Sequence, residues 1–305
     1  MASASQHVPS NRQALLGVGL AVLAAIGFSA KAIFVKLAYR HPIDAVTLLA
    51  LRMVFSVPFF LAAALWSRGQ GQAAALEKRD WMAVLGLGLI GYYLSSLLDF
   101  SGLQYISAGL ERLILFLYPT MVVLLSALLL KQPFGRREML AMALSYAGIV
   151  LVFMHDVAGG HLGWTLGAGL VFGSTLTYAI YLIGAGQAIA RMGATRFTAY
   201  AMTVASAATL LQFAVTHPVA ALEQSLPVYE LGFAMAILST VLPVFMLSAS
   251  IRLIGSGQTS LIGSIGPVAT ILLAHVFLGE KVSLLQVAGS SLVLAGVLAI
   301  SMRRR

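Results

Sequence analysis

Residues 108–152 read AGLERLILFLYPTMVVLLSALLLKQPFGRREMLAMALSYAGIVLV, two long apolar runs separated by one short polar turn. A helix needs roughly 20 apolar residues to cross the hydrocarbon core of a bilayer. The rest of the chain has the same character, since 60% of its 305 residues are apolar and only 10% are charged. Soluble domains carry about 25% charged residues. The apolar runs are continuous and do not alternate like the strands of a membrane barrel, so we expect membrane-spanning helices.

Apolar runs bounded by charged residues, proline or glycine divide the chain into ten predicted membrane helices. They cover approximately residues 13–37, 44–66, 81–101, 105–129, 137–154, 163–187, 196–216, 227–250, 256–278 and 282–302. The connecting loops are too short for a soluble domain. The first run is longer than the core of a signal peptide, so we expect it to remain in the protein.

Lysine and arginine are unequally distributed over the predicted loops. The two termini and the loops on their side of the membrane carry most of these residues, whereas the opposite side has only Lys36, Arg40 and Lys281. Basic loops are retained in the cytoplasm, so we expect both termini to be cytoplasmic and the protein to be a multi-pass protein of the inner (plasma) membrane. The net charge of +9 is explained by these signals, and we expect no nucleic-acid partner.

The quoted stretch recurs 148 residues later, where residues 256–300 read SGQTSLIGSIGPVATILLAHVFLGEKVSLLQVAGSSLVLAGVLAI. The two stretches align without a gap and match at three special positions: Gly109 with Gly257, Pro119 with Pro267, and Gly148 with Gly296. We therefore divide the chain into two repeats, residues 1–154 and 155–305. Each repeat has five predicted crossings, an odd number, so the second lies upside down in the membrane. Inverted repeats are found in secondary transporters, which bind substrate near the midplane where the halves meet.

These residues also carry a family resemblance. The mid-helix prolines, the turn Leu-Gly-Glu-Lys-Val (278–282) and the run Gly-Ser-Ser-Leu-Val-Leu-Ala-Gly (289–296) resemble the EamA family of the drug/metabolite transporter superfamily. The first repeat departs from the family pattern at residues 131–133, Lys-Gln-Pro, where the family usually has Gly-Glu. Over its whole length the chain is similar to YddG-type amino-acid exporters. The resemblance implies export of aromatic and other neutral amino acids.

Pro119 and Pro267 are predicted to kink two symmetry-related helices near the midplane. Such kinks either serve packing alone or shape a cavity or gate, and we favour the second role. A Gly169-x-x-x-Gly173 motif predicts close packing between helices.

Ionisable residues inside a membrane each cost about 2.5–3.5 kcal/mol at the centre of a helix, so they are candidates for function. The predicted helices contain Lys31, Arg52, Asp99, Glu111 and Arg112, all in the outer half of the membrane. Arg112 and Asp99 are candidates for an ion pair, which either tethers helices or contacts substrate. Lys31 and Arg52 either join a charge pair or extend to the outer interface. Glu111 and Arg112 could bind the amine and carboxylate of a zwitterion.

A second candidate set is polar but uncharged. Tyrosines near the predicted mid-membrane level are expected either to pack through buried hydrogen bonds or to form an aromatic wall of the substrate cavity. They are Tyr92, Tyr93, Tyr118, Tyr178 and Tyr181. Gln258, Ser260 and Ser264 share one face of a predicted helix, where they either contact substrate or allow close helix packing.

The sequence contains no cysteine, no metal-binding histidine motif and no nucleotide-binding loop, so we expect no metal, no cofactor and no ATP-driven activity. We expect an all-helical membrane protein that transports amino acids or other small metabolites by alternating access and is compatible with a monomer. The alternatives are a facilitator or exporter of another metabolite or drug, and a membrane-embedded enzyme. No pairing of nucleophile and base supports the enzyme.

Overall fold

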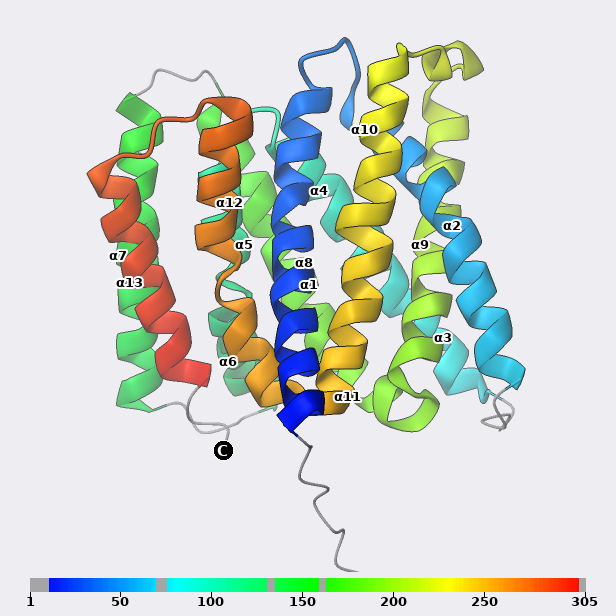
Figure 1. The fold of residues 1–305 in the computed structure, drawn as a ribbon, viewed down its shortest axis with the longest axis horizontal. Coiled ribbons are helices and arrows are strands. Elements are labelled where there is room, and N and C mark those ends of the chain that lie inside the picture. The colour runs from blue at the N-terminus through cyan, green and yellow to red at the C-terminus, as the bar shows by residue number, and fades with distance from the viewer. Residues whose placement is uncertain (1–10, 70–75, 131–134, 159–162, 302–305) are drawn as a thin grey trace, which may run out of the picture.

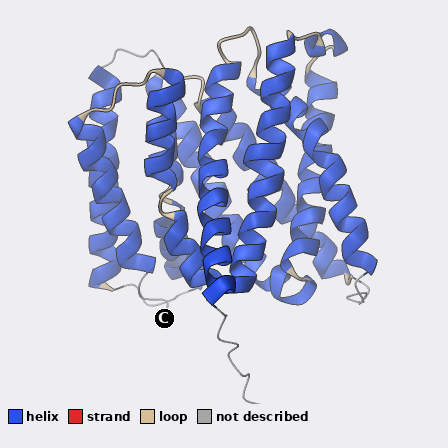
Figure 2. Cartoon of the chain, in the orientation of Figure 1, coloured by secondary structure: helices blue, strands red, loops and turns tan. Residues whose placement is uncertain are grey.

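The computed structural model describes residues 11–69, 76–130, 135–158 and 163–301, and in this part of the chain every regular element is a helix (Figures 1 and 2). The first repeat comprises α1 (Asn11–Ala38), α2 (Ala45–Gly69), α3 (Lys78–Gly88), the π-helix η1 (Leu89–Leu94), α4 (Ser95–Gly102), α5 (Ala108–Leu115), α6 (Tyr118–Leu130) and α7 (Arg136–Ala158). The second comprises α8 (Trp164–Met192), α9 (Ala194–Thr216), the 3-10 helix η2 (Val219–Leu222), α10 (Leu226–Ala236), the π-helix η3 (Ile237–Val241), α11 (Leu242–Gly263), α12 (Gly266–Leu273), the π-helix η4 (Ala274–Leu278) and α13 (Leu284–Ser301).

Seven of the described helical segments are long and apolar enough to cross a bilayer. Three shorter apolar helices, Met142–Val152, Gly266–Leu278 and Leu284–Leu298, lie beside them. Each of the predicted segments falls on one of these helices. We call the end of the bundle where α1 and α3 begin the base, and the opposite end, where α2 and α8 begin, the top (Figure 1).

The predicted loop between residues 250 and 256 is wrong. Helical backbone continues through this turn, so α11 includes the end of one predicted segment and the start of the next. Gly255 and Gly257 indicated a loop, but the chain turns here without leaving helical geometry. A helical turn satisfies its own backbone hydrogen bonds, which explains why a tight connection can remain helical.

The helices form a closed ring in which neighbours come from different halves of the chain. The ring has eight positions, and each contacts the next. In order they are α1, α10 with α11, α2, α9, α3 with α4, α8, α5 with α6, and α12, which contacts α1 again. The pair α7 and α13 packs beside this ring (Figure 1). Because the halves alternate, each half contacts the other along nearly every helix, and α1 lies opposite α4 with three ring positions between them on either side.

Backbone irregularities occur at matching places in the two halves. The π-helix η1 begins at Leu89 and η3 begins at Ile237, 148 residues later. Two-residue breaks separate α5 from α6 and α11 from α12, and these breaks are also 148 residues apart. Irregular backbone at membrane depth is tolerated where it is enclosed by protein or lines a polar cavity. The spacing of these irregularities is that of the sequence repeat.

The predicted close packing at Gly169-x-x-x-Gly173 is wrong. A Cβ atom at Gly169 would meet nothing within 4 Å, and one at Gly173 would make ordinary contact with Leu98 at 3.4 Å. Among the described glycines, the closest approach to the backbone of another helix instead joins α7 to α13, where a Cβ at Gly148 would lie 2.4 Å from the carbonyl oxygen of Gly289. Small residues allow close approach only when another helix lies on their side.

Candidate functional site

Three charged side chains meet in the top half of the ring. The Lys31 ammonium pairs with the Asp99 carboxylate and lies 3.1 Å from Oε1 of Glu111. The Glu111 side chain is 0% exposed, that of Asp99 4% and that of Lys31 17%. Lys31 is on α1 and Asp99 is on α4, the opposite member of the ring, so their contact crosses the ring interior. All three residues are among the candidates from the sequence, but Asp99 pairs with Lys31 and not with Arg112.

This ionic cluster is incompletely satisfied. Neither oxygen of Glu111 nor Oδ1 of Asp99 accepts a hydrogen bond, because the Lys31–Glu111 contact has ionic distance but not hydrogen-bond geometry. A buried carboxylate needs both a counter-charge and hydrogen bonds to offset the loss of water. Two carboxylates share one ammonium here, so ionic attraction stabilises the cluster more than hydrogen bonding does. A cation or proton that reached the carboxylates would change their pairing with Lys31.

A second contact crosses the ring above this cluster. The hydroxyl of Tyr39, which follows α1, donates a 2.6 Å hydrogen bond to the carbonyl oxygen of Phe100 on α4. Together with the Lys31–Asp99 pair it joins opposite ring members twice near the top. The top half of the ring is therefore closed by contacts between α1 and α4.

The two arginines have different surroundings. Arg52 is 5% exposed, donates to the Ser96 hydroxyl at 3.1 Å and lies 4.8 Å from the Phe100 ring centroid. Neither it nor Lys31 therefore takes the alternative position at the outer interface. In the described part of the chain, Arg112 makes no hydrogen bond or ion pair, and its Nε atom is buried without a partner.

Most of the predicted tyrosines form one aromatic cluster. Tyr178 stacks on Tyr181 with centroids 5.6 Å apart and contacts Tyr118 edge-on at the same distance. The hydroxyls of Tyr92 and Tyr181 are hydrogen-bonded at 2.8 Å. Tyr93 points elsewhere and donates to Gln212 on α9, since adjacent helical residues project in different directions. The cluster joins η1, α6 and α8, which lie on one side of the ring interior.

The predicted polar face of residues 258–264 is only partly described. Gln258 is exposed, and Ser264 lies in the break before α12 and is partly buried. The side chain of Ser260 lies outside the described residues. The structure therefore does not bring this set together with the ionic cluster.

The two prolines start helices and do not kink them. Pro119 is the second residue of α6 and Pro267 is the second residue of α12. The first-turn amides of a helix have no partner within it, so the missing N–H of proline costs little there. The sequence predicted a kink at each proline. The structure instead has a complete break just before each proline, followed by a new helix.

Hydroxyl groups from the opposite half support both breaks. Ser29 donates toward the carbonyl of Gly266 at 2.9 Å, and Thr175 donates toward the carbonyl of Ile114 at 3.1 Å. Both hydroxyls are also within hydrogen-bond distance of a carbonyl in their own helix. The Ile114 carbonyl also accepts the backbone N–H of Leu117, and Gly266 is the first residue of α12, so each hydroxyl adds a contact between the halves beside a break. The sequence marks Thr175 as a polar residue that either contacts substrate or allows close helix packing. Ser29 was missed because a serine in an apolar run shows no sign of a partner distant in sequence.

Glu280 is another missed residue, although it lies in the quoted Leu-Gly-Glu-Lys-Val turn. Its carboxylate accepts a 3.1 Å hydrogen bond from the backbone amide of Ala108, at the start of α5. Carboxylates stabilise helix N-termini by pairing their free amides. The equivalent turn of the first repeat, residues 131–134, lies outside the described residues.

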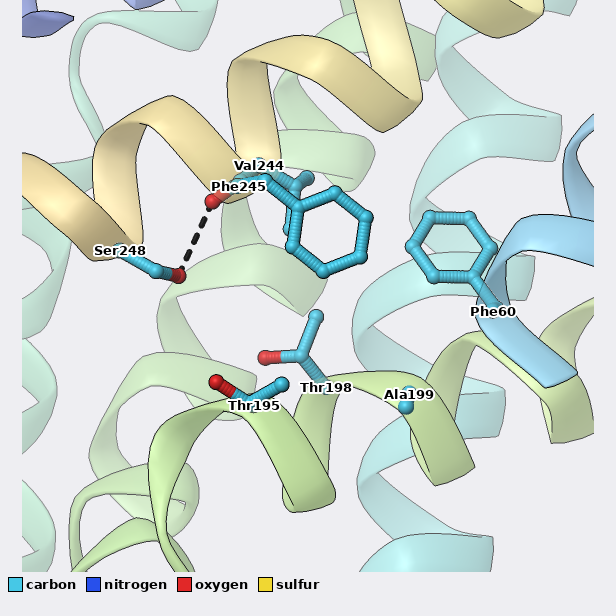
Figure 3. A pocket seen from close by; sticks show the side chains of 7 residues that line it. All are labelled: Phe60, Thr195, Thr198, Ala199, Val244, Phe245 and Ser248. Atoms are coloured by element: carbon cyan, nitrogen blue, oxygen red, sulfur yellow. Dashed lines mark hydrogen bonds between the residues drawn. The ribbon is translucent and has the colours of Figure 1, made fainter. Parts of the chain in front are cut away.

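A small pocket lies toward the base between α2, α9 and α11, three consecutive ring members (Figure 3). Figure 3 shows the rings of Phe60 and Phe245 facing each other, with Thr195 and Thr198 beside them and Ser248 bonded to the Val244 carbonyl. The pocket has a free volume of about 10 Å³, roughly one water molecule and far below the roughly 300–1,000 Å³ of typical ligand sites, so it is too small for a solute in this conformation. Tyr92 packs against the same group of apolar residues and connects it to the aromatic cluster.

A closed ring of apolar helices with ionisable groups in its interior defines the class of multi-pass membrane transporters of small substrates. The chain belongs to the EamA-like transporter family, whose profile matches residues 15–154 and 165–302. This membership, like the names of the relatives, indicates a transporter and not an enzyme.

Two bacterial relatives match along most of their length. The chain is 30% identical over 292 residues to the uncharacterized transporter YcbK of Bacillus subtilis, covering 91% of this chain and 90% of that protein. It is 22% identical over 303 residues to the uncharacterized transporter sll1319 of Synechocystis, covering 92% and 91%. A solved crystal structure of 18% identity superposes with a TM-score of 0.65 over 93% of this chain and 95% of that one, which shows the fold alone.

Proposed function

We propose that this protein is a secondary transporter that exports amino acids, aromatic and other neutral ones, across the inner membrane by alternating access. Residues 1–154 and 155–305 would be two inverted repeats that move against each other around the ring interior, with both termini in the cytoplasm. The observation that carries this proposal is the alternation of the two halves around the ring. A relative movement of the halves would then change contacts on both sides of every ring helix at once.

The positions of the contacts support one direction of opening. Contacts between opposite ring members lie in the top half, at Lys31–Asp99 and Tyr39–Phe100, whereas the pocket lies toward the base. Under the proposed orientation the top faces outward. This conformation would therefore be closed to the outside, and the ionic cluster with the Tyr39 contact would be the outer gate.

The helix breaks offer a physical basis for the movement. Each break is supported by a hydroxyl of the other half, Ser29 for the break before α12 and Thr175 for the break after α5. Broken helices bend with little loss of backbone hydrogen bonding, and transporters place them beside the substrate. Relative displacement of the halves would change both contacts together.

The test is flux of radiolabelled amino acids into proteoliposomes that contain the purified protein. We expect uptake that saturates with substrate concentration and accelerates when unlabelled substrate is loaded inside, which is counterflow. Uptake no greater than in protein-free vesicles across a broad panel would refute transport of this class. Flux that neither saturates nor shows counterflow would indicate a passive channel instead. Equal rates with and without an imposed pH gradient would exclude proton coupling.

A further inference from the structure

Arg112 is the charged group of the interior that the ionic cluster leaves unused. Its guanidinium lies against Gly266, where a Cβ atom would be 2.6 Å from Nη2 and 3.3 Å from Cζ. A side chain at this position would therefore displace the guanidinium. The guanidinium therefore lies beside the backbone break that precedes α12.

Arg112 interacts electrostatically with the phenols of Tyr118 and Tyr178 and with the carboxyl of its neighbour Glu111. In the described part of the chain it forms no hydrogen bond or ion pair with any of them. Neither phenol makes a hydrogen bond with another residue in the described part of the chain, and both side chains are partly buried. A guanidinium has five donors and no acceptor. The missing partner of this group is therefore an acceptor, and a carboxylate matches the planar guanidinium best.

The formal charges of the interior agree with this. Three cations, Lys31, Arg52 and Arg112, face two carboxylates, Asp99 and Glu111, when each group has its ordinary charge. Both carboxylates already share the Lys31 ammonium, so an amino group of a solute would compete with Lys31 for them. The interior therefore has one positive charge in excess. Arg112 is the cation that forms neither a hydrogen bond nor an ion pair in the described part of the chain.

We propose that Arg112 binds the carboxylate of the transported solute, with the apolar body of the solute against Tyr118 and Tyr178, and that the solute needs no amino group. The substrate class is then apolar and aromatic monocarboxylates, of which neutral amino acids are one subset. This inference rests on the proposed transport function and specifies which part of the substrate is recognised. Bound carboxylate would supply the acceptor that Nε of Arg112 lacks.

The experiment compares three solutes that share a side chain. For a phenyl and for an isobutyl side chain, the probes are the amino acid, the 2-oxo acid that lacks the amine, and the amino-acid amide that lacks the carboxylate. Binding to the purified protein is measured by calorimetry, and flux is measured in proteoliposomes. We expect the 2-oxo acid to bind at least as tightly as the amino acid and the amide to bind at least about tenfold more weakly.

Variants separate recognition from folding. Arg112→Gln is expected to weaken binding of the 2-oxo acid by about 10–100-fold, as for loss of a hydrogen-bonded charge, and to leave the amide unaffected. Arg112→Lys keeps the charge but loses the planar fork and should bind with intermediate affinity. Arg40→Gln is the matched control because Arg40 is exposed at the top of the bundle. Thermal unfolding of each variant reports whether it is folded.

The outcomes distinguish the two proposals. Transport of amino acids together with an amide that binds as well as the 2-oxo acid would overturn the carboxylate inference and leave the transport function standing. The same conclusion would follow if folded Arg112→Gln protein bound the 2-oxo acid like the wild type. Absence of both binding and flux for all three probes would refute the proposed function itself.

Discussion

Removal of the Lys31 ammonium should destabilise the protein far more than removal of the Asp99 charge. The Lys31→Met substitution leaves two carboxylates without their ion-pair partner at positions where the side chains are 4% and 0% exposed. Asp99→Asn instead leaves Lys31 3.1 Å from Glu111, an intact pair of opposite charges. The difference follows from the shared ammonium, because one cation serves both acids.

The magnitudes can be worked from this geometry. Removing one partner from a buried ion pair costs about 3–5 kcal/mol, and loss of one hydrogen bond between retained groups costs about 1 kcal/mol. A change of 1 kcal/mol shifts Tm by about 2 °C in a large domain. We therefore expect Tm to fall by about 6–10 °C for Lys31→Met and by about 2 °C for Asp99→Asn.

The assay is thermal unfolding of the purified variants in one detergent at pH 7. Lys281→Met is the control, since Lys281 is exposed at the top of the bundle. A triple variant with Lys31→Met, Asp99→Asn and Glu111→Gln should recover most of the lost stability, because no buried charge of the cluster remains. If Lys31→Met unfolds at the same temperature as Asp99→Asn, the shared-ammonium cluster is not what stabilises this region.

Three further predictions concern other parts of the chain. Burial raises the pKa of the Asp44 carboxyl, but hydrogen bonds from Thr47 and Val46 and the nearby His217 outweigh it, so the pKa lies below its usual value. This stabilisation is present above about pH 4 and is lost as pH falls through the lowered pKa. Thermal unfolding of the wild type and of Asp44→Asn is measured from pH 7 to pH 3. We expect Tm to fall less toward low pH in the variant, and an equal fall in both proteins would contradict a lowered pKa of Asp44. Gly148→Ala should cost about 1–3 kcal/mol, because its Cβ would overlap the facing backbone. The matched Gly169→Ala, which meets open space, should be neutral or stabilising by up to about 1 kcal/mol, and equal melting temperatures for the two variants would refute the packing argument.

The sequence alone indicated the apolar segments and the places near Pro119 and Pro267 where the helices are irregular. Apolar length is a local property, and lipid imposes it on every crossing, so it can be read from the sequence. A proline in an apolar run likewise marks the place where a helical hydrogen bond is missing, whatever lies around it. The candidate charges were visible for the same reason, since a charge in lipid needs a special site.

Only the tertiary structure decided which of these groups meet. Lys31 and Asp99 are 68 residues apart, and they pair because α1 and α4 are opposite members of the ring, which no local pattern shows. The same ring order separates Tyr93 from the other tyrosines and leaves Arg112 without a partner. It also places Gly148 against another helix and Gly169 in open space. The surrounding lipid requires each membrane segment to be long and apolar and makes a charged residue in it conspicuous, so both features are visible in the sequence. Which charged residues pair depends on contacts between segments, and only the folded ring brings those segments together.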